Sequence, residues 1–116
     1  MSKPTVAVEG YIKYEFELYY TVNGKAVTNF KVEDENLELH HIVAWESLAK
    51  ACCQELDRND KVMVIGYFEV RKWNDKEGNE KSRDQIVAKR VILLNTNPDS
   101  PKRIAREVGK NVSPWE

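Results

Sequence analysis

Trp73 and the two cations before it are the residues in this sequence best suited to chemistry. In the stretch FEVRKWNDKEGNEKSRDQIV, alternating residues predict a strand that ends near Trp73, then a charged run around Gly78, then a second strand. Arg71 and Lys72 immediately precede the ring. Aromatic rings stack on nucleic-acid bases and cations follow phosphates, so this hairpin could hold a single strand. The alternative is that Trp73 packs against the rest of the domain or a sister subunit.

The remaining candidate residues argue against catalysis. Trp45 ends a predicted strand just before a helical pattern, a corner where a tryptophan more often covers the core than binds a ligand. His40 and His41 are consecutive on a strand, so they point to opposite faces and cannot bind one metal ion together. We find no other metal-ligand spacing, no phosphate-binding glycine loop and no serine or cysteine with a partner base. We therefore predict no metal, no cofactor and no enzymatic activity.

Length and composition predict one globular domain. The chain has 116 residues, of which 41% are hydrophobic and 32% charged. No apolar run approaches the ~18 residues that a membrane span needs, and the N-terminus MSKPTVAVEG does not resemble a secretory signal. The adjacent Cys52 and Cys53 are interpreted as small apolar residues of a reduced protein.

The charge is unevenly distributed along the chain. The net charge is −1, but residues 1–60 contain 6 Lys and Arg against 11 Asp and Glu, whereas residues 61–116 contain 12 against 8. A nucleic-acid binder usually has a clearer basic excess. Any such function must therefore depend on local placement of the cations.

The elements that must position these residues follow from periodicity. Between Val6 and Val22 every even position except Gly10 is apolar or aromatic, which predicts one long strand with a bend at the glycine. Asn23-Gly24 predicts a hairpin turn into a second strand, and a third strand ends at Trp45. Apolar spacing of four predicts a helix over residues 46–56. A fourth strand covers 61–73, with the inward face Val62, Val64, Phe68 and Val70, and a fifth covers 85–94.

Three strands, one helix and two strands, with glycines inside long strands, predict an all-β fold with one short helix. We expect the OB-fold, a five-stranded Greek-key barrel, over residues 1–95. Residues 96–116 form a short tail, in which Ser100 could cap one short helix that stops at Gly109.

The segments YTVNGKAVTNFKV, HHIVAWESLA and VMVIGYFEVRKWNDKEGNEKSRDQIVA resemble the bacterial-type single-stranded DNA-binding protein family over about residues 5–94. The resemblance implies an OB-fold that binds single-stranded DNA. It also implies a homo-oligomer, with a tetramer favoured and a dimer as the alternative.

The resemblance assigns roles to individual residues. Trp45 and Trp73 match base-stacking aromatics, Arg71 and Lys72 match basic positions on the same surface, and His40 matches a histidine near a subunit contact. The full hypothesis has Tyr19 and Tyr67 as further stacking candidates, Lys13 and Arg83 near phosphates, and Val6 and Val8 with His40 at the subunit interface.

The sequence departs from the family pattern at four places. Leu39 occupies the position of a stacking tryptophan, Tyr19 stands where a basic residue is usual, the connection VEDENLE is short and acidic, and the acidic tail tip of the family is absent. The chain resembles the short, tailless members that occur in cyanobacteria and plastids, which implies a location in bacterial cytoplasm, in plastid stroma or at the thylakoid. The departures leave an alternative function open: an OB-fold module for protein interaction or assembly whose DNA-binding surface has decayed.

Overall fold

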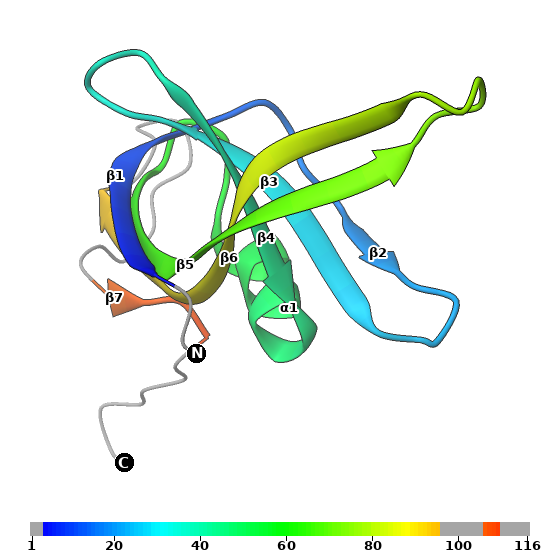
Figure 1. The fold of residues 1–116 in the computed structure, drawn as a ribbon. Helices are drawn as coiled ribbons and strands as arrows, with labels where there is room; N and C mark the ends of the chain where they lie inside the picture. The colour runs from blue at the N-terminus through cyan, green and yellow to red at the C-terminus, as the bar shows by residue number, and fades with distance from the viewer. Residues whose placement is uncertain (1–3, 96–105, 110–116) are drawn as a thin grey trace.

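Five strands close into a ring in the computed structural model, which describes residues 4–95 and 106–109 (Figure 1). The elements in chain order are β1 (Thr5–Lys13), β2 (Leu18–Tyr20), β3 (Ala26–Glu33), β4 (Leu39–Trp45), α1 (Glu46–Glu55), β5 (Lys61–Asn74), β6 (Glu80–Asn95) and β7 (Arg106–Glu107).

The ring runs β1-β5-β6-β4-β3, and β3 returns to β1 through pairs that include Ile12 with Val32. β4 and β6 are parallel, and the other neighbours are antiparallel. β2 extends the sheet beyond β3, and β7 pairs with β6. The prediction of a five-stranded OB-fold with one helix between the third and fourth strands of the ring is confirmed.

Gly10 and Gly66 allow the ring to close. β1 pairs with β5 as far as Tyr11 and with β3 from Tyr11 onward, so it changes partners beside Gly10. A Cβ atom at Gly10 would overlap the backbone of Glu33, and one at Gly66 would overlap the carbonyl of Val87. The register of β5 against β6 also shifts at Gly66. Both glycines therefore permit a close backbone approach at a bend, and the bend at Gly10 was predicted.

The inward positions of the ring form the core, together with one face of α1. The helix packs against β3 and β4, with Ala49 and Cys52 fully buried. Burial raises the pKa of the Cys52 thiol to about 12, so this thiol stays protonated and acts as a small apolar residue. Cys53 is also free and is half-buried. The core positions with no exposed surface include Ile12, Val32, Ile42, Val62, Val64, Val91 and Leu93.

The predicted long first strand is wrong in its middle. β1 stops at Lys13, because Tyr14 has φ of 65° and turns the chain, and β2 begins only at Leu18. The side-chain alternation survives the turn, since Phe16 and Leu18 still pack against the core, with the Phe16 ring 5.4 Å from that of Phe30. The period-two alternation therefore showed which side chains point inward, but it did not show where the strand ends.

The predicted core face of β5 is correct only within the ring. Val62 and Val64 are fully buried, whereas Phe68 is 39% and Val70 46% exposed. β6 pairs with β4 only near Ile86, so the β5–β6 hairpin projects beyond the ring as a two-stranded ribbon (Figure 1). No third strand covers its inner face in the described part of the chain.

The predicted tail helix falls largely outside the described residues, as do residues 96–105. Its described end is not helical: Arg106 and Glu107 form β7, and Val108 is buried against β6 with its amide donating to the Val91 carbonyl.

Candidate nucleic-acid interface

The tip half of the β5–β6 hairpin places Trp73 among cations. Arg71 lies directly opposite Arg83 and Trp73 opposite Lys81, so all four side chains share one face. The Arg71 guanidinium carbon lies 5.3 Å and that of Arg83 6.0 Å from the Trp73 ring centroid. The ring is 37% exposed. Like charges directly opposite each other destabilise a sheet, and here the electron-rich ring partly offsets them.

Lys72 does not join this face. It lies opposite Ser82, and because side chains alternate along a strand, it points to the other side of the hairpin with Val70. The grouping of Lys72 with Arg71 and Trp73 in one surface is therefore wrong.

Trp45 and Tyr19 lie at the other end of the outer face of the sheet. Val27 of β3 pairs with Tyr19 of β2 on one side and with Trp45 of β4 on the other, so the three form a row. Trp45 is 41% and Tyr19 53% exposed. Trp45 borders a hollow of about 330 Å³ beside the β2–β3 turn, where Lys25 also lies. Trp45 is thus not a core lid.

A cationic hollow of about 220 Å³ lies between these ends. Its lining includes Lys13, Lys31, His41 and Arg83. Lys31 and His41 are cross-strand partners on β3 and β4. The pKa of His41 is lowered from its ordinary value, mainly by burial and then by the charges of Arg83 and Lys31. Lys31 and His41 could not be assigned to this surface from the sequence, because their proximity to Arg83 depends on how β4 meets β6.

These groups share one face of the sheet, although Val43 and Val87 between them are buried. His41, Val43 and Trp45 alternate along β4 and so share its outer face. Val43 pairs with Val87, which pairs with Tyr67 of β5. The Lys89 ammonium lies 5.1 Å from the Tyr67 ring centroid. Seven of the eight residues predicted to contact DNA, all except Lys72, therefore lie on or beside this outer face: Lys13, Tyr19, Trp45, Tyr67, Arg71, Trp73 and Arg83.

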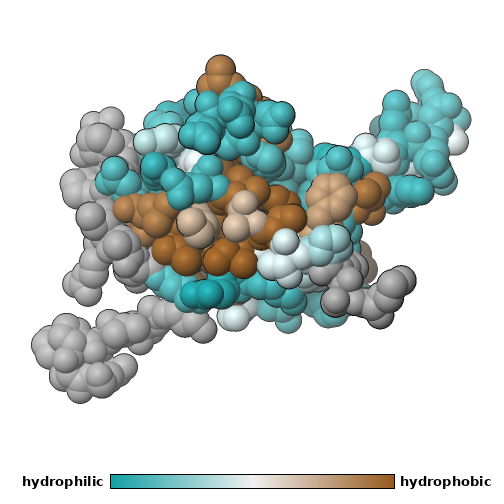
Figure 2. All heavy atoms as spheres, turned by 60° about the vertical axis from the view of Figure 1, so that its left-hand side comes forward, coloured by the Kyte–Doolittle hydropathy of each residue, from teal (hydrophilic) through white to brown (hydrophobic). Residues whose placement is uncertain are grey.

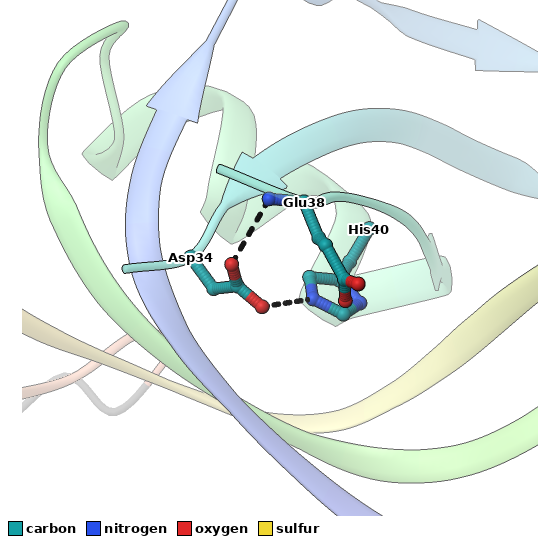
Figure 3. Close-up of side chains that lie close together, drawn as sticks. All are labelled: Asp34, Glu38 and His40. Atoms are coloured by element: carbon teal, nitrogen blue, oxygen red, sulfur yellow. Dashed lines mark hydrogen bonds and ion pairs between the residues drawn. The ribbon is translucent and has the colours of Figure 1, made fainter. Parts of the chain in front are cut away.

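The acidic connection between β3 and β4 is a tight, internally bonded turn (Figure 3). Asp34 Oδ1 accepts hydrogen bonds from the amides of Asn36 and Glu38, and Oδ2 lies 2.8 Å from His40 Nε2. The hydrogen bond from His40, followed by that from the Glu38 amide, lowers the pKa of Asp34. The donor atoms of Asp34, Glu38 and His40 lie within 4.8 Å of one another. The internal bonds account for this convergence, which positions the turn and assigns no metal.

The residues predicted at a subunit contact lie away from the cationic hollow. His40 and Val8 line a groove of about 650 Å³ between β1 and the acidic turn. Val6 and Val8 are half-buried and pack against the core. Next to His40, a second hollow of about 450 Å³ has Phe68 in its lining. Figure 2 shows apolar side chains gathered in a band across one face, whereas the projecting hairpin is hydrophilic toward its tip.

The ring and its aromatic and cationic outer face define an OB-fold protein. The chain belongs to the single-strand binding protein family, which it matches over residues 4–94. It is 30% identical to single-stranded DNA-binding protein 1 of Chlorobaculum tepidum over 102 residues, covering 77% of this chain and 63% of that protein. It is also 30% identical to the single-stranded DNA-binding protein of Neisseria meningitidis serogroup A over 106 residues, covering 81% and 61%. The chain thus spans about three fifths of the length of these relatives.

The described residues contain no helix with the length and apolar character that crossing a membrane requires.

Proposed function

We propose that this chain binds single-stranded DNA with little sequence preference, as the names of its relatives state for those proteins. The observation that carries the proposal is the exposed Trp73 ring with Arg71 and Arg83 beside it, continuous with the hollow at Lys31 and His41. Exposed rings stack on any base, and adjacent cations follow the backbone, so the surface suits bases of every kind. Tyr67, Tyr19 and Trp45 extend the path along the outer face.

The local charges support binding despite the net charge of −1. Phosphate contacts depend on cations within about a Debye length, ~8 Å at physiological ionic strength. No ion pair occurs for Arg71, Arg83 or Lys31 with another described residue, so these three cations are available to phosphates. Most of the acidic turn instead lines the groove beside β1, where Asp34 is bonded to His40, whereas Glu38 lines the hollow of about 450 Å³ next to His40.

The exposure of both tryptophans favours this function over a protein-interaction module with a decayed surface. A decayed surface would bury the rings or interrupt the cations with acidic residues. The cationic hollow does include Glu15, whose carboxylate lies 3.7 Å from Arg58. Glu69 lies between Tyr67 and Arg71 on the outer face, where its carboxylate accepts a hydrogen bond from Gln85.

Assembly into a homo-oligomer, with a tetramer favoured over a dimer, is also part of the proposal. The half-buried Val6 and Val8, the exposed Phe68 and Val70, and the apolar band in Figure 2 offer surface that a second copy would cover. Light scattering on the purified protein tests it, since an oligomer has a multiple of the 13.5 kDa chain mass. A mass of one chain at micromolar concentration would reject assembly. The family membership suggests bacterial cytoplasm or plastid stroma as the location.

Tryptophan fluorescence during titration with a poly-thymidine oligomer tests DNA binding directly. We expect saturable quenching at low salt that weakens as salt rises, because stacking quenches indole emission while salt competes for the phosphates. Trp73→Phe and Trp45→Phe should each lose part of the quenching. An unchanged spectrum at low salt, together with no gel shift, would reject the proposal and favour the interaction module.

A further inference from the structure

The hollow at the centre of the outer face has the size and lining of an anion site. Its volume of about 220 Å³ exceeds that of several water molecules at ~30 Å³ each, so a phosphate group fits. Four basic side chains line it, from four different strands: Lys13 on β1, Lys31 on β3, His41 on β4 and Arg83 on β6.

Arg83, which lines the hollow, has an unsatisfied donor. Its Nε atom is buried and has no hydrogen-bond partner among the described residues. A buried N–H without an acceptor is unfavourable, so such groups are usually paired with protein, water or a ligand. A phosphate oxygen in the hollow is an acceptor of the kind that guanidinium groups bind best.

His41 faces more positive than negative charge. Lys31 and Arg83 lower its pKa further after burial, and Lys13 lines the same hollow. Two acidic groups in or beside the lining are paired with cations. Glu15, in the lining, pairs with Arg58, and Lys13 itself pairs with Glu33 at 3.5 Å. His41 also lines the hollow of about 450 Å³ next to His40, and the charged or titratable groups in that lining are His40, Glu38 and Asp84.

We propose that this hollow seats one backbone phosphate of single-stranded DNA and that His41 takes up a proton as the phosphate enters. The proposal rests on the single-stranded DNA binding proposed above and adds a regulatory property to the same surface. In the free protein, the charges of Lys31 and Arg83 oppose a third positive charge. A backbone phosphate adds one negative charge beside them and so reduces this opposition, which lets the protonated imidazole join the cations around the anion.

The direction of the pH dependence follows from linkage. The pKa of His41 in the free protein lies below the ordinary 6.5, and the bound phosphate raises it. Affinity for DNA therefore increases as the pH falls from the bound pKa to the free pKa, by up to about tenfold per pH unit for one proton. Above the bound value the imidazole is neutral in both states, and below the free value it is charged in both, so the affinity is flat on either side.

The test is the affinity for a thymidine oligomer between pH 5 and pH 8 at constant ionic strength, for wild type and His41→Gln. We expect wild type to bind more tightly at the acidic end, and His41→Gln to lack this acidic gain. His41→Lys should bind tightly at all pH values, because its charge is fixed. His40→Gln is the matched control: it removes the neighbouring histidine, which points to the opposite face and bonds to Asp34, so the wild-type slope should persist.

An NMR titration of the histidine rings with and without the oligomer gives a second readout. The pKa of His41 should rise on binding. Equal slopes for wild type and His41→Gln, or an unmoved His41 pKa in a protein that does bind DNA, would overturn the phosphate seat and leave DNA binding intact. Absence of DNA binding by wild type at every pH would reject the proposed function and this inference with it.

Discussion

Replacing Trp73 with alanine should weaken single-stranded DNA binding without changing its salt dependence. The two guanidinium groups 5.3 and 6.0 Å from the ring centroid leave the ring 37% exposed, so it offers one platform for one base. Stacking is worth about 1–3 kcal/mol per base, which corresponds to a loss of about 5- to 150-fold in affinity. Arg71 and Arg83 stay in place, so the number of phosphates contacted, and hence the slope of log affinity against log salt, should not change.

The assay is fluorescence anisotropy of a dye-labelled thymidine oligomer at four or more salt concentrations. Thermal unfolding should be unaffected, because Trp73 lies on the projecting hairpin and outside the core cluster. Tyr11→Ala is the matched control. The Tyr11 ring is also exposed and also has a cation near it, Lys61 at 5.8 Å, but it borders the groove beside the acidic turn.

Two outcomes would refute the reasoning. A folded Trp73→Ala variant that binds within twofold of wild type would show that the ring is not a platform. An equal loss from Tyr11→Ala would show that any exposed aromatic matters, and that the outer face has no special role.

Three further predictions concern the ring of strands and the charges on its surface. Gly66→Ala should reduce the free energy of unfolding in urea by about 1–3 kcal/mol or more, because its Cβ would overlap the Val87 carbonyl. Gly78→Ala, at φ of +84° in open space, should reduce it by about 1–2 kcal/mol. Equal stability of Gly66→Ala and wild type would contradict the close approach. Arg83→Gln should make the salt slope shallower by about 0.7, the contribution of one phosphate contact on a single strand, and an unchanged slope would remove Arg83 from the DNA path. Glu35→Gln, in the exposed acidic turn, should raise affinity severalfold at most, and only at low salt.

The sequence predicted the strands of the ring well, because strand identity and inward-facing positions depend on residues close together in the chain. Period-two alternation identifies strands and their inward faces, and the interior glycines mark the bends. It could not show that Tyr14 turns the chain, since Phe16 continues the inward pattern on the far side of the turn. Nor could it show where β5 leaves the ring: Phe68 continues the alternation of Val64, but whether β4 still covers that face depends on long-range pairing.

In the candidate site too, some residues could be predicted from local spacing, and others depend on long-range strand pairing. Arg71 and Trp73 are two positions apart on one strand, so their shared face was predictable, and the same spacing argument excludes Lys72. Arg83 lies near the Trp73 side chain because the register of the β5–β6 hairpin places it opposite Arg71. Lys31 and His41 were missed, because only the meeting of β3, β4 and β6 brings them to Arg83.

The distribution of charge explains how a chain of net charge −1 can offer a surface for an anion. The acidic residues of the β3–β4 connection would repel phosphate if they lay beside the cationic hollow. Asp34 instead folds back on His40, and none of the connection's residues lines that hollow. Because fields fall off within about a Debye length in salt, phosphates on the outer face respond mainly to Lys31, Arg71 and Arg83. Salt should therefore weaken DNA binding as it does for a basic protein, despite the acidic total.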